Sequence, residues 1–327
     1  MYNLITIGDA VLDTHVIIKD AAVECDIDGQ NCMLCLNYAS KIPIEDSFQA
    51  LGGNAANVAV GASRIGLKTA IISSIGKDSN AKIIIDELGK QGVNTDLIYE
   101  DAGIKTRYSV ILNFKGERTI LSYHQARQYV WPKIVPETDW IYYTSMSDGF
   151  EPIQEKLIEF LDRHETVRLA CNPGSFQLKN NLGLVREILP RVDILIVNLE
   201  EAEKILGTTV EKEKSVPAIM HGLLGAGARE AVITDGKNGA WAGNKEEILH
   251  LRTYPIQVVA KTGAGDAFSS GYLAAKIYGH DIATALSWGI ADSCSIITAH
   301  GSQRTLLDKN GIKKMLAKYA SIKPTQA

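Results

Sequence analysis

Short strands and amphipathic helices alternate along most of this chain, and this alternation constrains the fold more than any other feature. Strand-like apolar segments occupy residues 4–8, 69–76, 140–143, 167–171, 193–197 and 231–234. Helical apolar spacing occupies residues 54–65, 81–90, 153–163, 182–189, 200–206 and 216–224. Such alternation predicts an α/β three-layer sandwich, in which helices cover both faces of a mostly parallel central sheet. Ligands should then bind at the carboxyl ends of the strands.

Two segments interrupt the alternation. Residues 13–50 contain no good helix, and strand-like residues 108–114 and 118–121 flank a turn, as in a hairpin. We interpret residues 13–50 and 105–121 as one small β-sheet lid built from discontinuous sequence. The core then comprises residues 1–12, 51–104 and 122–327, with further helices expected at 264–277, 282–299 and 309–318.

The composition indicates a globular protein and excludes several classes. Of 327 residues, 46% are hydrophobic and 22% are charged, which is too apolar for a disordered chain. The net charge of −4, without a basic run, argues against binding to nucleic acid or to a membrane surface. No apolar run reaches the ~18 residues that span a bilayer, and the start has no cationic signal region. We therefore expect a cytoplasmic protein with no membrane partner.

The five cysteines are odd in number and too sparse for a disulfide scaffold, which fits a reducing compartment. Cys32 and Cys35 have the spacing of a metal-binding pair, but no second pair or histidine cluster accompanies them. We expect these two side chains to pack in the lid as small hydrophobic groups.

A glycine-rich turn at residues 262–266 is the most informative local motif. Gly263, Ala264 and Gly265 bring bare backbone amides to a helix start, where unpaired N–H groups attract an anion. Asp266 falls in the first helical turn, where it could accept the proton of a hydroxyl that attacks a bound phosphate. On spacing alone, an ordinary turn with an acid that complements the helix dipole is the simpler interpretation.

A second glycine-rich helix start lies at residues 52–57. Gly52 and Gly53 allow a ligand to approach the backbone closely. The amides of Asn54 and Asn57 are three residues apart, so both can face the hydroxyls of a polyol. The alternative is that Asn54 caps a helix of small residues that packs tightly on the sheet.

Three further positions follow predicted strands. Asn198 and Glu201 fit a helix capping box, and Glu201 could instead hold Mg²⁺ through water. Thr234, Gly236 and Gly239 form either a simple turn or a site for nucleotide phosphates. Asp13 could bind sugar hydroxyls or be a solvated acid at the lid edge.

Taken in this order, these motifs resemble the ribokinase-like (phosphofructokinase-B) sugar kinase family. The two glycine-rich segments, at 52–57 and 262–268, are similar to the two family signatures, and Asn198 with Glu201 matches its N-x-x-E element. No P-loop is present. The resemblance implies an α/β sandwich with a β lid, ATP and Mg²⁺ as cosubstrate and metal, and phosphoryl transfer to a CH₂OH group.

The resemblance also implies residue roles. Asp266 would be the general base, and the amides of Gly263, Ala264 and Gly265 would stabilise the transferring phosphoryl group. The acceptor would contact Asp13, Gly52, Gly53, Asn54 and Asn57. ATP would contact Asn198, Thr234, Gly236, Gly239 and Thr262, and Glu201 would help to place Mg²⁺ through water. A homodimer through the lid is a further implication.

The chain departs from the family pattern at two places. Ala260 stands where many members have an Asp that is tied to a monovalent-cation site, and Lys261 follows it. We therefore expect weak dependence on K⁺, with Lys261 supplying positive charge. Asn54 stands where the ribose-specific pattern has Lys, which shifts the expected acceptor toward a hexose, a keto-sugar acid or a nucleoside.

Three functions therefore stay open at this stage. The leading one is an ATP-dependent sugar kinase. A nucleoside kinase on the same scaffold would need a stacking platform in the lid, for which Tyr38 and Phe48 are candidates. A non-catalytic sugar- or nucleotide-binding module is the third, although such a module would have little use for Asp266 beside a phosphate.

Overall fold

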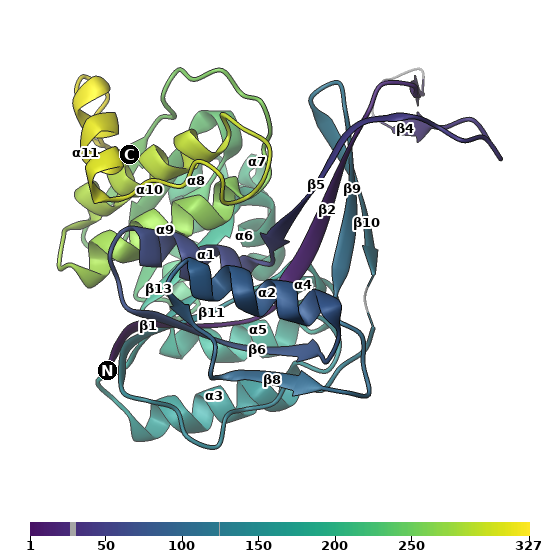
Figure 1. Cartoon of the computed structure of the whole chain (residues 1–327). Coiled ribbons are helices and arrows are strands. Elements are labelled where there is room, and N and C mark those ends of the chain that lie inside the picture. The colour runs from purple at the N-terminus through teal and green to yellow at the C-terminus, as the bar shows by residue number, and fades with distance from the viewer. Residues whose placement is uncertain (27–30, 124) are drawn as a thin grey trace.

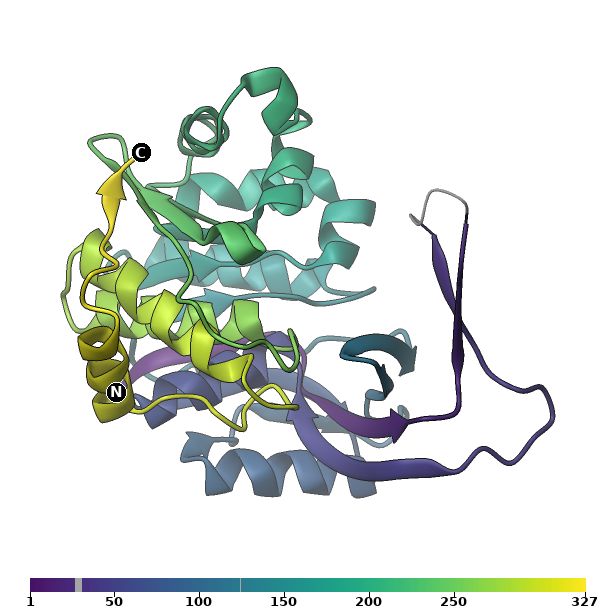
Figure 2. The same cartoon turned by 90° about the horizontal axis from the view of Figure 1, so that it is seen from above.

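The computed structural model describes residues 1–26, 31–123 and 125–327, and these form a central sheet between two helical layers (Figures 1 and 2). The sheet order is β17-β16-β15-β14-β13-β12-β11-β1-β6-β7, with β8 also paired to β6. Its strands are β1 (Tyr2–Ile7), β6 (Thr69–Gly76), β7 (Val93–Asn94), β8 (Ile98–Asp101), β11 (Thr138–Tyr143), β12 (Arg168–Cys171), β13 (Ile194–Asn198), β14 (Glu230–Thr234), β15 (Ala240–Gly243), β16 (Ile248–Leu251) and β17 (Thr325–Gln326). Pairing is parallel from β7 and β8 through β14, and antiparallel from β14 to β17.

Apolar side chains on both faces of the sheet explain the two helical layers. Leu4 and Ile5 are neighbours on β1, yet they belong to separate buried clusters, because successive side chains of a strand point to opposite faces. On the Leu4 side lie α1 (Asn54–Arg64), α9 (Ala264–Ile277), α10 (Ile282–Ile296) and α11 (Lys309–Lys318), with α2 (Ser79–Lys90) beside α1. On the Ile5 side lie α3 (Glu151–Arg163), α4 (Ser175–Asn180), α5 (Leu182–Ile188), α6 (Leu199–Leu206) and α8 (Val216–Gly225). The predicted three-layer α/β fold is confirmed.

A separate four-stranded sheet forms the lid, in the order β10-β9-β2-β5. Its strands are β2 (Val11–Ile18), β5 (Ile44–Gly52), β9 (Tyr108–Phe114) and β10 (Glu117–Tyr123). Figure 1 shows it rising from one edge of the core. Both segments that were predicted to build the lid contribute strands, and residues 27–30 of the first lie outside the described residues. The exact domain boundaries stay a prediction.

The expectation for the lid cysteines was wrong. Strands β3 (Ala22–Cys25) and β4 (Cys32–Cys35) pair antiparallel and place Cys25 opposite Cys32, with 4.0 Å between their Cα atoms, where they form a disulfide. The side chains of β3 are exposed, so this hairpin has no core in which a cysteine could pack. Cys35, which lies opposite Ala22 at the other end of this hairpin, is a free thiol.

Other differences are smaller. The helix expected over residues 282–299 ends at Ile296. Strands β15 and β16 were not expected, and they extend the parallel sheet by antiparallel pairing. None of the described helices is both long enough and apolar enough to cross a membrane.

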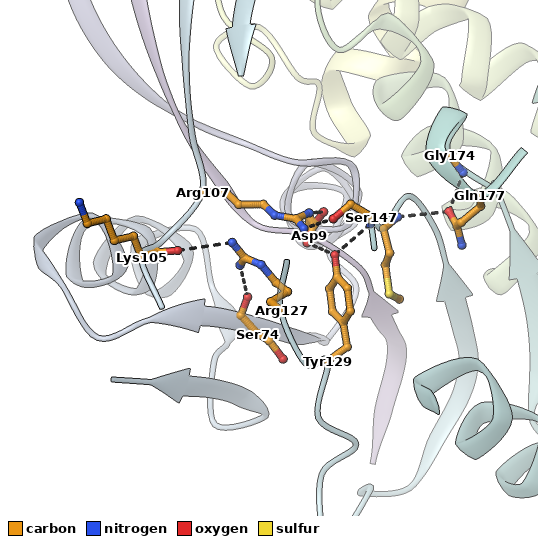
Figure 3. A network of polar contacts seen from close by, with 10 residues as sticks. Asp9, Ser74, Lys105, Arg107, Arg127, Tyr129, Ser147, Gly174 and Gln177 are labelled. Atoms are coloured by element: carbon orange, nitrogen blue, oxygen red, sulfur yellow. Dashed lines mark hydrogen bonds and ion pairs between the residues drawn. The ribbon is translucent and has the colours of Figure 1, made fainter. Parts of the chain in front are cut away.

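A buried polar network ties the lid to the core (Figure 3). Arg107 immediately precedes β9 and is 1% exposed, and its guanidinium forms an ion pair with Asp9, which follows β1. The same guanidinium donates a hydrogen bond to the hydroxyl of Ser147, and Tyr129 Oη donates to Asp9 Oδ1 at 2.8 Å. Because Asp9 follows a strand of the central sheet and Arg107 precedes a strand of the lid, the pair joins the two sheets at the base of the lid.

Replacing Arg107 by Ala should lower the free energy of unfolding by about 3–5 kcal/mol, since it leaves the Asp9 carboxylate buried without its charge partner. Urea unfolding measures this loss. Arg229→Ala is the matched control, because Arg229 pairs with Asp193 at 2.8 Å but its side chain is 74% exposed. That variant should lose about 1 kcal/mol or less. Equal losses in the two variants would contradict a structural role for the buried pair.

Candidate active site

The start of α9 is built for an anion. Gly263 caps the helix in the left-handed region, with φ = 78°, and a Cβ at this position would press against Ser302. Ala264 and Gly265 are the first helical residues, so their N–H groups have no acceptor within the helix. The small residues leave these N–H groups accessible, and the helix dipole adds positive potential at the same place.

Asp266 lies in the first turn of α9, as predicted, and a neighbouring amide holds its carboxylate. Asn57 Nδ2 donates to Asp266 Oδ2 at 2.7 Å. Asn57 Oδ1 in turn accepts hydrogen bonds from Ser302 Oγ at 3.1 Å and from Gln303 Nε2 at 2.9 Å, which fixes the orientation of the amide. Burial raises the pKa of Asp266 to about 6; the Asn57 hydrogen bond opposes this rise and the charge of Asp13 adds to it.

Asp266 faces a cavity of about 320 Å³ that contains the predicted anion site. Gly263, Ala264 and Gly265 line it beside Asp266. Polar residues at strand ends, Asn172, Asn198 and Thr234, complete its wall together with Glu201 of α6 and Ser269 of α9. The motifs that the sequence placed at separate strand ends therefore meet at one edge of the sheet.

A larger and mostly apolar cavity of about 480 Å³ adjoins the anion site at the start of α9. Ala264 and Gly265 line both cavities, and so does Thr234. The turn after β14 contributes Gly236 and Gly239, as expected for a nucleotide site. Phe268, Ile290, Ile256 and Tyr254 are among the apolar wall residues that could contact a base.

A third cavity, of about 220 Å³, lies under the lid. Asp13 and Asp9 line it together with Gly53 and Asn54, and Asn54 also lines the Asp266 cavity, so the two cavities meet there. Thr262 was expected on the nucleotide, but it lines this lid cavity instead. Burial raises the pKa of Asp13 to about 6, while a hydrogen bond with Ser109 and the charge of Arg118 oppose the rise.

Close contacts with neighbouring atoms explain why two glycines stand at the start of α1. The carboxylate of Asp13 lies against Gly52, where a Cβ would overlap it. Gly53 has φ = 91° and caps α1, and a Cβ there would overlap the backbone of Asp9. The prediction that Asn54 caps this helix was wrong, because α1 begins at Asn54 and the left-handed Gly53 occupies the cap position. The Asn54 side chain is therefore free to line the cavities.

Asn198 and Glu201 do form the predicted capping box at the start of α6. Asn198 Oδ1 accepts from Glu201 N, and Glu201 Oε2 accepts from Asn198 N, both at 2.9 Å. Burial raises the pKa of the Glu201 carboxyl. Both residues also line the Asp266 cavity, so the structural and the metal-binding interpretations are compatible.

The described residues contain no group of three or more His, Cys, Asp or Glu side chains arranged to hold a metal ion. Mg²⁺ retains several waters and is commonly held by one or two carboxylates plus substrate phosphates. Glu201, with the amide oxygen of Asn198, is an oxygen-donor set that fits such binding.

The chain matches a protein-family model over residues 35–310, described as pfkB family carbohydrate kinase. It belongs to the pfkB family of carbohydrate kinases. This kinase is 23% identical over 327 residues to an ATP-dependent 6-phosphofructokinase of Thermoanaerobacterium thermosaccharolyticum, an alignment that covers 96% of this chain and 94% of the relative. It is 27% identical over 270 residues to a ribokinase of Staphylococcus aureus, covering 80% and 87% of the two chains.

The fold of this kinase is also similar to that of an Arabidopsis thaliana ribokinase solved in complex with ribose and ATP. The TM-score is 0.79 at 19% identity, and the match covers 96% of this chain and 98% of the plant protein. At this identity, the likeness establishes the fold, and the site must be argued from the residues of the kinase itself.

The sequence did not reveal Arg118 as a residue of the site, whereas Lys261 was expected to supply positive charge there. Arg118, on β10 of the lid, lines the Asp266 cavity, and so does Lys261 of the core. Lys261 Nζ pairs with Glu117 Oε1 across the lid–core gap at 3.2 Å. Arg118 lies inside the predicted hairpin, but only the packing of the lid over the core shows that it reaches the anion site.

Proposed function

We propose that this kinase transfers the γ-phosphoryl group of ATP to a primary hydroxyl (CH₂OH) of a sugar. One observation carries the proposal: the Asp266 carboxylate lines the same cavity as the free amides at the start of α9, and Asn54 joins that cavity to a polar acceptor cavity. ATP would lie along the apolar cavity between the Gly236 turn and α9, with its γ-phosphate toward Gly265.

In the proposed reaction, the acceptor oxygen forms a bond to the γ-phosphorus while the bond to the bridging oxygen of ADP breaks. The hydroxyl proton passes to Asp266, whose carboxylate is oriented by Asn57. The amides of Gly263, Ala264 and Gly265 stabilise the charge on the phosphoryl oxygens. Positioning and electrostatic stabilisation provide most of the acceleration, and proton removal adds a smaller part.

Glu201 and Asn198 would hold Mg²⁺ through water at the edge of this cavity. When bound, Mg²⁺ supplies positive charge that neutralises the phosphate oxygens of ATP. Arg118 would add a second positive charge from the lid. Closure of the lid would exclude water, which otherwise competes as an acceptor.

The described cavity walls favour a sugar over a nucleoside. Tyr38 is 98% exposed, and Phe48 stacks on His15 at 4.7 Å between ring centroids, so neither lines the acceptor cavity. No described aromatic side chain lines that cavity as a platform for a base. A non-catalytic binding module is disfavoured because it would gain nothing from a carboxylate placed beside a phosphate site.

Asp266→Asn should lower kcat by ~10²–10⁴-fold, because it keeps the shape of the side chain but removes the proton acceptor. The measurement is ADP release with Mg·ATP against a panel of ketoses, aldoses, keto-sugar acids and nucleosides. Turnover near that of the unmodified enzyme would show that Asp266 is not the base. If no acceptor caused ADP release while ATP still bound, the result would instead support the function of a non-catalytic binding module.

Acid pH should abolish transfer, because the pKa of Asp266 is raised to about 6 and its protonated form cannot accept the hydroxyl proton. kcat/KM should therefore fall as the pH decreases through about 6. Asp13→Asn removes a negative charge that raises the pKa of Asp266. The fall in kcat/KM should therefore occur at lower pH in this variant, while turnover persists. If kcat/KM fell at the same pH in Asp13→Asn as in the unmodified enzyme, the assignment of Asp266 as the base would be contradicted. A loss of turnover as complete as in Asp266→Asn would also contradict it.

We also propose that activity is largely independent of K⁺. Residue 260 is Ala, so its side chain contributes no carboxylate to a cation site. Its backbone N–H and that of Val259 donate to the carbonyl of Ile297 at 3.2 and 2.8 Å. Lys261 adds a positive charge beside the anion site, which disfavours a second cation nearby. Turnover should agree within about twofold in K⁺ and in tetramethylammonium buffers. Strong activation by K⁺ would refute this.

A homodimer formed through the lid is part of the same proposal. Tyr108, Val110 and Leu112 alternate on β9 with the buried Ser109 and Ile111, so they occupy the face turned away from the core. Apolar groups on an open sheet face are suited to a partner surface. Light scattering of the purified protein should report twice the chain mass, and a monomer at micromolar concentration would contradict the proposal.

A further inference from the structure

We propose that the acceptor is an uncharged polyol of monosaccharide size, which carries neither a phosphate nor a carboxylate group before the reaction. This inference rests on the proposed phosphoryl transfer, and it narrows the acceptor class. It removes the keto-sugar acids and sugar phosphates from the candidates. Charge is distributed unevenly between the two adjoining cavities, and this favours a neutral acceptor.

The lid cavity is lined by carboxylates and, among the described residues, by no basic side chain. Asp9 and Asp13 contribute acidic groups to the wall, and among the described residues no Lys or Arg lines it. A phosphate or carboxylate on the acceptor would face Asp9 and Asp13 here, and the Arg118 charge that acts on Asp13 comes from the adjoining Asp266 cavity. Anion sites in proteins use Arg or Lys side chains, or unpaired backbone amides, to avoid such repulsion.

The remaining polar groups of this cavity suit hydroxyls. The strand registers place Asp13 beside Ser109, and Ser109 beside Ser122, so these three side chains form a row across β2, β9 and β10. Asn54 and Thr262 face the same cavity from the core. Hydroxyls and amides both donate and accept hydrogen bonds, and a carboxylate accepts from a pair of sugar hydroxyls.

An apolar row lies next to the polar one. Ile111 and Ile120 are paired across β9 and β10, one step further along the lid, and both line the cavity. Val11 adds a third aliphatic contact. This combination suits a sugar ring, which has hydroxyls at its edge and C–H groups on its faces. The cavity volume of about 220 Å³ lies below the roughly 300 Å³ at which pockets for larger ligands begin.

The basic side chains of the site lie in the Asp266 cavity, at the end opposite to the lid cavity. Arg118 and Lys261 line the Asp266 cavity, where the phosphoryl group transfers, and neither lines the lid cavity. An acceptor that presents its CH₂OH to Asp266 would direct its remaining groups away from these two side chains. The positive charges can therefore act on the transferring phosphoryl group, but they do not favour a second anion at the distal end of the acceptor.

Arg107 does not supply the missing charge. It lies close to the lid cavity, but it is 1% exposed and does not line the wall. Its guanidinium is already engaged by the Asp9 carboxylate and by Ser147 (Figure 3). Withdrawing it from Asp9 to bind an acceptor would leave a buried carboxylate without its ion-pair partner, which proteins strongly disfavour.

The test compares matched neutral and anionic acceptors at fixed Mg·ATP. The probes are ribose and fructose against fructose 1-phosphate, fructose 6-phosphate and 2-keto-3-deoxygluconate, each followed by ADP release and by product analysis. We expect kcat/KM for the best neutral sugar to exceed that of every anionic probe by at least about tenfold. An anionic probe that equals or exceeds the neutral sugars overturns this inference and leaves the proposed function intact.

A pair of serine variants makes the test independent of which sugar is preferred. Ser122→Lys adds a cation that faces the cavity from an exposed position of the lid, and should reduce the neutral-to-anionic ratio by about tenfold. Ser47→Lys adds the same charge on β5 of the lid at an exposed position outside this cavity, and should leave the ratio unchanged. Equal ratios in both variants would overturn the assignment of this cavity to the acceptor. Absence of transfer to every probe, while Mg·ATP binds, would overturn the proposed function itself and this inference with it.

Discussion

The hydrogen bond from the Asn57 amide to the Asp266 carboxylate joins the two glycine-rich helix starts, and the site depends on it. Asn57 belongs to α1 and Asp266 to α9, helices that lie more than two hundred residues apart in the chain and pack on the same face of the sheet. Gly53 and Gly263, both in the left-handed region, set where these helices begin. A carboxylate is thus held beside unpaired amides, where an anion is favoured and a base is close to it.

Charge is separated along the site. Amides and basic side chains surround the place of phosphoryl transfer, and carboxylates and serines surround the acceptor. The lid contributes to both ends, because Arg118 and Ser122 lie four residues apart on the same strand and reach different cavities. The buried pair of Asp9 and Arg107 fixes the lid at the base of this arrangement. Lid position and substrate selection are therefore coupled through a few polar contacts.

Much of this could be predicted from local sequence, because periodicity and helix capping are local. The strand at residues 69–76 and the helix at 264–277 have the predicted bounds, and the Asn198–Glu201 capping box formed as expected. The errors came from features that depend on pairing or packing. Gly53 rather than Asn54 caps α1 because Asp9 approaches the backbone there, and the disulfide depends on a hairpin register. The position of Arg118 depends on how the lid packs over the core.

The central claim is that Asp266 receives the proton of the acceptor hydroxyl. A crystal structure with Mg²⁺, the non-hydrolysable analogue AMP-PNP and the best sugar from the acceptor panel tests it most directly. We expect the primary hydroxyl oxygen to lie within about 2.6–3.2 Å of an Asp266 carboxylate oxygen and to face the γ-phosphate. A hydroxyl that instead contacts Asp13, with Asp266 turned away from the sugar, would contradict it.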